Sequence, residues 1–315
     1  MGMEEMAVDR RGFLRSAAAA AVTAPTVGGV LAASARADDD GERGPRGGRS
    51  IPREKISIQL YTLRELPIEQ VIKGLAQIGY KTVEHAGFGG LTALQFRDLL
   101  RQYGVRATSG HQGIPQPFDE AAWRQQVADA VTVGQRFIVN PASPVVVPPD
   151  GNFANIHSFQ TAAGWRAYAQ DLNAAGAIAR SAGLRFGYHS HFWEFQGLTD
   201  DTPLTGYDVM MAETDPRLVH FELDLYWAWY AHRDPVGLIA QYGDRIRQLH
   251  VKDMRYVNHQ PTFADDGTGV INFARIFAAA GNVGDHEYIV ERDDAGATAL
   301  TTAKVGFDFL NRIRF

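Results

Sequence analysis

The stretch Gly183-Leu184-Arg185-Phe186-Gly187-Tyr188-His189-Ser190-His191 follows a long Ala-rich segment and combines a glycine, a short apolar run and two histidines. A left-handed glycine that ends a helix and leads directly into a strand is the usual helix-to-strand turn of α/β folds. The same arrangement recurs at Gly79, Gly104 and Gly243, each just before an apolar run. The sequence therefore predicts helices and strands in alternation.

Eight short β-rich runs alternate with helical patterns along most of the chain. This pattern predicts an α/β fold, a single-domain (β/α)₈ TIM barrel, in which each strand is followed by a helix. An open doubly wound sheet is the alternative, but Ser57–Leu66 after the first strand contains no glycine and so no dinucleotide-binding fingerprint. We expect strands at Ile56–Tyr61, Lys81–His85, Val105–Gly110, Arg136–Asn140, Leu184–His189, Leu218–Asp224, Ile246–Val251 and Tyr288–Glu291. Helices are expected from Pro67 and at Leu91–Tyr103, Asp119–Val133, Thr161–Ala182, Thr202–Glu213, Pro235–Tyr242, Phe273–Ala280 and Thr298–Asn311.

The N-terminal segment has the pattern of an export signal. Arg10-Arg11-Gly12-Phe13-Leu14 precedes an uncharged, Ala-rich run, and Ala35-Arg36-Ala37 is a small-x-small cleavage site. The paired arginines resemble a twin-arginine signal, so we expect export to the periplasm or the cell exterior. A membrane anchor is the alternative, which the weak hydropathy of the run disfavours. The expected organisation is a signal peptide over 1–37, a flexible linker over 38–52 and the barrel over 53–315.

Composition excludes several classes of function. Lys and Arg number 31 against 36 Asp and Glu, which gives a net charge of -5, and the chain has no cysteine. A mildly acidic protein is a poor partner for nucleic acid, because binding the phosphate backbone requires a basic surface. Without cysteine, any transition-metal site must use His, Asp and Glu. No later run is long and apolar enough to anchor the mature protein in a membrane.

Four consecutive strands end in a histidine or a carboxylate. Side chains two residues apart on a strand share a face, and closing a barrel brings one side chain per strand towards the axis. We predict that His189, Asp224, His250 and Glu291 hold a divalent metal: Mn²⁺, Zn²⁺, Co²⁺ or Fe²⁺. Each also has a structural interpretation, as a hydrogen-bonded histidine or a helix-capping aspartate. Glu222 is expected to face outward or to pair with an arginine.

Several short motifs, in this order, resemble the xylose-isomerase-like TIM-barrel superfamily, often called sugar phosphate isomerases/epimerases. They are Ser57–Arg64, Gly187–His191, Leu223–Trp227, His250–Asp253, Gly267–Asn272 and Tyr288–Asp293, and the resemblance covers about Arg53 to Phe315. Many members bind a divalent metal through Glu, Asp, His and Glu on strands five to eight. The resemblance implies that Asp224, His250 and Glu291 are ligands. His189 stands where the first Glu is expected, a departure that puts a two-glutamate epimerase mechanism in doubt.

A divalent metal would polarise a carbonyl and stabilise the adjacent enediolate, which makes removal of the α-proton easier. The candidate catalytic residues are Glu291, Glu194 and Lys252, although Lys252 could instead pair with Asp253. If the strand-five register is wrong by two residues, His191 replaces His189 as the ligand. The candidate substrate-binding residues are His191, His111, Trp227 and Tyr61, of which the aromatic rings could stack on a sugar.

Three classes of function remain. The first, which we prefer at this stage, is a metal-dependent sugar isomerase or epimerase acting on a sugar or keto-sugar. The second is a metal-dependent lyase or hydratase acting on a 3-keto-glycoside or an inositol-type ketone. The third is a non-catalytic sugar-binding barrel or an endonuclease-IV-like phosphodiesterase. The acidic charge and the single ligand set argue against the phosphodiesterase. The expected partners are a small-molecule carbohydrate and the twin-arginine export machinery, and a homo-oligomer stays open.

Overall fold

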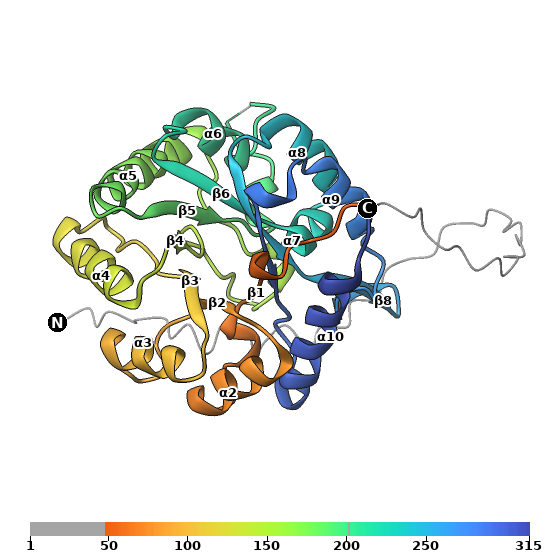
Figure 1. The fold of residues 1–315 in the computed structure, drawn as a ribbon. Helices are drawn as coiled ribbons and strands as arrows, with labels where there is room; N and C mark the ends of the chain where they lie inside the picture. Colours follow the sequence, from red (N-terminus) through yellow and green to blue (C-terminus); the bar gives the residue numbers. More distant parts are fainter. Residues whose placement is uncertain (1–47, 201) are drawn as a thin grey trace, which may run out of the picture. The chain divides into compact units, whose positions relative to one another are not determined.

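The computed structural model describes residues 48–200 and 202–315, so the predicted signal peptide and most of the predicted linker lie outside the described residues (Figure 1). The described chain falls into two units. One is the segment Val147–Ile156 together with Gly48, in which Phe153–Asn155 forms a 3₁₀ turn. The other comprises Arg49–Val146 and His157–Phe315 and contains all the strands and α-helices described below.

Eight parallel strands form a ring, which confirms the predicted TIM-barrel fold. Six of them make one sheet in the order β1-β10-β7-β6-β5-β4, and β2 pairs with β3 in a second sheet. Single bridges between Gln59 and Glu84 and between His111 and Val139 join the two sheets. The strands are β1 Ile56–Ile58, β2 Thr82–His85, β3 Arg106–Gly110, β4 Phe137–Asn140, β5 Arg185–His189, β6 Val219–Asp224, β7 Ile246–Val251 and β10 Glu287–Val290.

Helices follow the strands and lie on the outside of the ring (Figure 1). Each packs an apolar stripe against the strands, as α2 does when it buries Val71, Ile72 and Leu75. The helices are α2 Ile68–Ile78, α3 Ala93–Gln102, α4 Glu120–Val133, α5 Ala162–Ser181, α6 Gly206–Glu213, α7 Leu225–Tyr230, α8 Pro235–Tyr242, α9 Phe273–Ala279 and α10 Ala299–Arg312.

Two local predictions differ from the structure. The first strand ends at Ile58 because the chain turns into a 3₁₀ helix at Leu60–Leu63, capped by the Gln59 side chain, which accepts a hydrogen bond from Tyr61 N. Gly79, Gly104 and Gly183 have the predicted positive φ. Gly243 has φ -56° and stays helical, so the left-handed turn predicted there is wrong.

An antiparallel hairpin that the sequence analysis did not identify follows β7. It consists of β8 Asp253–Val257 and β9 Gln260–Ala264, joined by Asn258 and His259, which both have positive φ as in a two-residue hairpin turn. The carboxylate of Asp253 holds the base of this hairpin. It accepts hydrogen bonds at 2.7–3.2 Å from four backbone N–H groups, those of Met254, Gly267, Gly269 and Ile271.

The chain before β1 is attached to the end of the barrel. Arg49 N donates to Phe315 O at 2.8 Å and Phe315 N donates to Arg49 O at 3.2 Å. Ordered contacts thus begin inside the stretch predicted as a linker. In the part of the chain that the structure describes, no helix has the length and apolar character needed to cross a membrane.

Candidate active site and metal centre

The four predicted metal ligands lie together at the carboxyl ends of four neighbouring strands. His189 and Asp224 end β5 and β6, His250 lies near the end of β7, and Glu291 directly follows β10. One donor atom from each lies within 4.8 Å of the others, and all four residues are buried. Two imidazoles and two carboxylates suit a first-row transition metal, so the donor set fits the predicted ion. We call these four residues the outer cluster; their role as ligands stays a prediction.

Asp224 combines a structural contact with a position in the outer cluster. Its Oδ1 accepts a hydrogen bond from Trp227 N at 3.0 Å and caps α7. Its Oδ2 lies 3.9 Å from His189 Nε2 and 3.0 Å from Lys252 Nζ, so this oxygen remains directed at the centre of the cluster. The helix-cap interpretation and the ligand interpretation are therefore compatible.

Lys252 is buried among three carboxylates. Its Nζ lies 3.0 Å from Asp224, 2.7 Å from Glu291 and 3.1 Å from Asp293. Burial alone would lower the pKa of Lys252, but these carboxylates outweigh it and hold that pKa well above its usual value. The alternative pairing with Asp253 is wrong, because that carboxylate is used by backbone N–H groups at the base of the hairpin.

A second group of side chains lies next to the outer cluster, which we call the inner cluster: His111, Glu222 and Glu84. Glu222 Oε2 lies 2.8 Å from His111 Nε2, 2.8 Å from His189 Nδ1 and 3.0 Å from His250 Nε2. Glu84 Oε2 lies 2.7 Å from His250 Nε2. The expectation that Glu222 faces outward or pairs with an arginine is wrong: it is fully buried, because strand alternation places it on the same inward face as Asp224.

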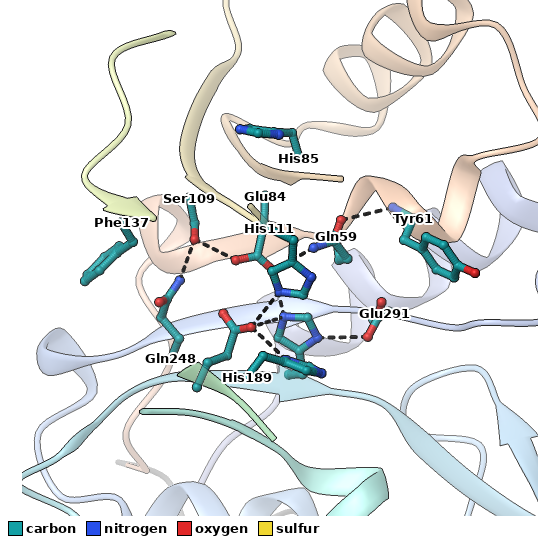
Figure 2. Close-up of polar contacts among 12 residues, drawn as sticks. Gln59, Tyr61, Glu84, His85, Ser109, His111, Phe137, His189, Gln248 and Glu291 are labelled. Atoms are coloured by element: carbon teal, nitrogen blue, oxygen red, sulfur yellow. Dashed lines mark hydrogen bonds and ion pairs between the residues drawn. The ribbon is translucent and has the colours of Figure 1, made fainter. Parts of the chain in front are cut away.

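Neutral side chains hold Glu84 in place. Gln59 Nε2 donates to Glu84 Oε2 at 2.8 Å, and Ser109 Oγ donates to Glu84 Oε1 at 2.6 Å, while Gln248 Nε2 donates to Ser109 Oγ at 2.9 Å (Figure 2). Burial would raise the pKa of Glu84, but the adjacent histidines outweigh it and hold that pKa well below its usual value. This network fixes the position of a charged carboxylate in the barrel interior.

His111, predicted to bind substrate, directs its Nε2 into the inner cluster. Burial favours the neutral ring, but Glu84 and Glu222 outweigh it and raise the pKa of His111 to about 9. A protonated His111 compensates part of the negative charge of these two carboxylates. Its side chain is 11% exposed, so most of the ring is occupied by protein contacts.

The loop after β5 separates the two candidate histidines of that strand. Donor atoms of His189 belong to the outer cluster, whereas those of His191 do not. The His191 ring stacks on Trp193 at 4.2 Å between centroids. Glu194 is fully buried and accepts hydrogen bonds from Tyr188 Oη at 2.5 Å and from His191 N at 2.8 Å. Burial raises the pKa of Glu194 to about 7, and both of its oxygens hold the loop.

Aromatic side chains line one side of the site. Lys252 Nζ lies 5.3 Å from the ring centroid of Trp227 and 5.8 Å from that of Phe263, which is supplied by β9. The ring of His191 lies 5.8 Å from that of Trp227. The ring of Tyr61 points away from the histidines (Figure 2). The guanidinium of Arg64 lies over this ring, 4.1 Å from its centroid. Trp227 and His191 are thus placed beside the outer cluster. Tyr61 lies within electrostatic range of Glu291, Asp293 and Lys252, and its role in substrate binding stays a prediction.

The sequence analysis did not identify Asp293, whose carboxylate lies 3.1 Å from Lys252 Nζ. It lies two residues after Glu291, so the same spacing that places Glu222 and Asp224 on one face would have identified it. It is buried, and burial raises its pKa to about 6 even though Lys252 opposes that rise. Phe263 gave no such signal, because its hairpin is an insertion after β7.

Comparisons with known proteins agree with this architecture. The sequence profile of the family described as "Xylose isomerase-like TIM barrel" matches residues 72–313. An inosose dehydratase from Geobacillus kaustophilus is 25% identical over 279 residues, which cover 78% of this chain and 87% of that protein. A structure of a sugar phosphate isomerase/epimerase from Parabacteroides distasonis has a TM-score of 0.68 at 23% identity, and covers 86% of this chain and 99% of that one.

A further solved structure, of the IOLI protein with a bound zinc atom, has a TM-score of 0.62 at 13% identity and covers 82% of this chain and 99% of that chain. At such identities the likeness of the structures establishes the fold alone. The profile match spans most of the barrel and includes every strand that carries the outer cluster. The chain therefore belongs to the xylose isomerase-like TIM barrel family.

Proposed function

We propose that the protein is a metal-dependent lyase that eliminates water, or another group β to a ketone, from a cyclic polyhydroxy ketone. The observation that carries this proposal is the one-sided placement of the proton-handling groups. The strand β5 supplies the imidazole of His189, whereas Lys252 and Asp293 lie together after β7 and β10. An elimination can use an acid and a base on one face of the substrate. The inosose dehydratase name of the Geobacillus relative supports the same class.

The outer cluster would hold the ion, and the wall formed by His191 and Trp227 would contact the ring of the substrate. When bound, a divalent metal polarises a ketone and stabilises the charge of an enolate. Every other step in the proposal belongs to the side chains. Mn²⁺, Zn²⁺, Co²⁺ and Fe²⁺ all suit a site of two imidazoles and two carboxylates.

Asp293 and Lys252 would move the protons. Asp293 pairs with Lys252 Nζ at 3.1 Å and does not belong to the outer cluster, so its carboxylate is not a metal ligand and would accept the proton from the carbon next to the ketone. The electron pair left on that carbon forms the C=C bond to the neighbouring carbon. The hydroxyl on that neighbour takes a proton from the Lys252 ammonium and leaves as water. The proton on Asp293 then returns to the Lys252 amine.

The test is product analysis in D₂O with the metal-loaded protein, using a keto-inositol, a 3-keto-glycoside and free ketoses. The proposal expects loss of water or of the glycosidic group, and an unsaturated ketone. Epimers that carry deuterium, without elimination, would instead support the isomerase or epimerase. Saturable binding without exchange or product would support a sugar-binding barrel.

A matched pair of variants makes this test specific to the proton transfer. Asp293→Asn should lower turnover by at least about 100-fold, because an amide cannot accept the proton. Asp294→Asn is the control, since Asp294 is an exposed neighbour that pairs with Arg292 at 2.7 Å. Equal activity of the two variants would contradict the role assigned to Asp293.

A further inference from the structure

His189 and His250 each present one ring nitrogen to the outer cluster and the other to the inner cluster. His189 directs Nε2 towards Asp224 Oδ2 at 3.9 Å and places Nδ1 at 2.8 Å from Glu222. His250 has the opposite arrangement: Nδ1 lies 2.8 Å from Glu291, and Nε2 lies 2.7 Å from Glu84. The two rings thus meet the outer cluster through different nitrogens.

A neutral imidazole that ligates a metal through one nitrogen carries its hydrogen on the other, and an acceptor beside that N–H fixes the tautomer and the ring orientation. We propose that Glu222 and Glu84 are positioning residues that set opposite tautomers on the two histidines. His189 carries its hydrogen on Nδ1 and ligates through Nε2. His250 carries its hydrogen on Nε2 and ligates through Nδ1. This inference rests on the proposed function only in requiring that the outer cluster binds a metal.

Both carboxylates are buried and held in fixed positions, as a residue that orients a histidine ring must be. Glu222 and Glu84 are fully buried, so neither can exchange its histidine contacts for water. Glu84 is held at both oxygens by Gln59 and Ser109, at 2.8 and 2.6 Å. Glu222 Oε2 is also 2.8 Å from His111 Nε2, a third imidazole that donates to it and limits its movement. A fixed acceptor on each ring orients the opposite nitrogen towards the outer cluster.

A second possible metal site uses the opposite ring nitrogens of His189 and His250. His111, His189, Glu222 and His250 also place one donor atom each within 4.8 Å of the others. An ion there would take Nδ1 of His189 and Nε2 of His250, and would need Glu222 as a ligand rather than as an acceptor. We favour the outer position because Asp224 Oδ2 faces one ammonium, that of Lys252 at 3.0 Å, and one ring nitrogen at 3.9 Å, whereas Glu222 Oε2 already faces three ring nitrogens within 3.0 Å.

The first experiment identifies the tautomers directly in the wild-type protein. The chain from residue 38 on is labelled with ¹⁵N-histidine, loaded with Zn²⁺ and examined by long-range ¹H–¹⁵N correlation NMR. The variants His220→Gln and His85→Gln identify the signals of two buried histidines that belong to neither cluster. The inference expects one zinc-bound histidine protonated at Nδ1 and one protonated at Nε2, and assigns them to His189 and His250. The reversed assignment, or two identical tautomers, would overturn it. Failure of the wild-type protein to bind zinc would overturn the metal-dependent function as well.

The second experiment measures zinc affinity by competition with a chelator. Glu222→Gln should weaken zinc binding by about 10–100-fold, because the amide is a weaker acceptor and leaves the rings less basic. Glu287→Gln is the matched control: this carboxyl is also buried in the barrel, but its hydrogen bond is to Thr108 at 3.4 Å. Unchanged affinity of Glu222→Gln, or equal losses in the two variants, would refute the positioning role. If Glu222→Gln does not fold, the wild-type tautomers decide the question.

Discussion

Lys252 Nζ lies 2.7 Å from Glu291 Oε2, the same oxygen that lies 2.8 Å from His250 Nδ1. An ammonium and a candidate ligand nitrogen therefore share one carboxylate oxygen at the centre of the site. A divalent ion held by Glu291 would lie close to a positive charge, which weakens its binding. If the outer cluster binds a metal as proposed, the site loses part of its metal affinity and gains a proton donor next to the ion.

Replacing Lys252 should separate metal affinity from turnover. Lys252→Met should strengthen zinc binding, because the repelling charge is removed, and should lower turnover by at least about 100-fold, because the proton donor is lost. Without metal, the variant should be less stable by about 3–5 kcal/mol, since three buried carboxylates lose their partner. Calorimetric titration with zinc and thermal unfolding check both statements. Parallel losses of affinity and turnover would be evidence against proton donation by Lys252.

The two histidines of strand five should differ in their effect on the metal. His189→Ala should remove bound metal, because an outer-cluster donor is lost. His191→Ala should retain the metal and raise KM, because its ring stacks on Trp193 beside the site. Metal content by mass spectrometry and steady-state kinetics distinguish the two variants. If His191→Ala loses the metal and His189→Ala keeps it, the roles of the two rings are reversed.

Glu287 should make the protein less stable at high pH. Burial raises the pKa of Glu287 to about 7 from an ordinary 4.5, so the unfolded chain loses this proton before the folded protein does. The folded state is therefore penalised as the pH rises from about 4.5 through 7, by up to about 3 kcal/mol. Glu287→Gln should remove this penalty and be more stable than the wild type at pH 8 but not at pH 4. Denaturant unfolding at both pH values measures the difference, and a gain confined to pH 4 would reverse the assigned sign.

We propose that the protein is exported through the twin-arginine pathway, on the evidence of Arg10-Arg11 and the uncharged segment after it. Arg10→Lys combined with Arg11→Lys should keep the protein in the cytoplasm, because the pathway distinguishes the paired arginines from other positive charges. Cell fractionation with immunodetection is the measurement. Undiminished accumulation outside the cytoplasm would show that these arginines do not direct export.

The sequence predicted the strands of the barrel well because each is a short apolar run, and a left-handed glycine that ends the preceding helix marks the start of β2, β3 and β5. The observed β7 has the predicted bounds Ile246–Val251, and β5 begins one residue later than predicted, at Arg185. The side chains of the outer cluster could be predicted for the same reason: strand ends converge in a barrel.

The contacts of the inner cluster could not be predicted in the same way. Glu84 meets His250 across the barrel, a contact between strands that are far apart in the chain. Glu222 was expected to face outward or to pair with an arginine, because burying a carboxylate without partners is costly. The sequence does not reveal the three imidazoles that compensate its burial. The hairpin β8–β9 was not predicted because it is inserted between β7 and α9, outside the alternation of strands and helices on which the prediction was based.

The two single bridges of the ring give the inner cluster a mechanical consequence. Glu84 and His111 form these bridges through their backbones, at the two seams where the pair β2–β3 joins the larger sheet. Their side chains then reach across to β6 and β7 through Glu222 and His250. Amide hydrogens of β2 and β3 should therefore exchange with solvent through a smaller opening than those of the other strands. The ion pairs of the inner cluster therefore connect β2 and β3 to the larger sheet at the same place as the proposed metal site.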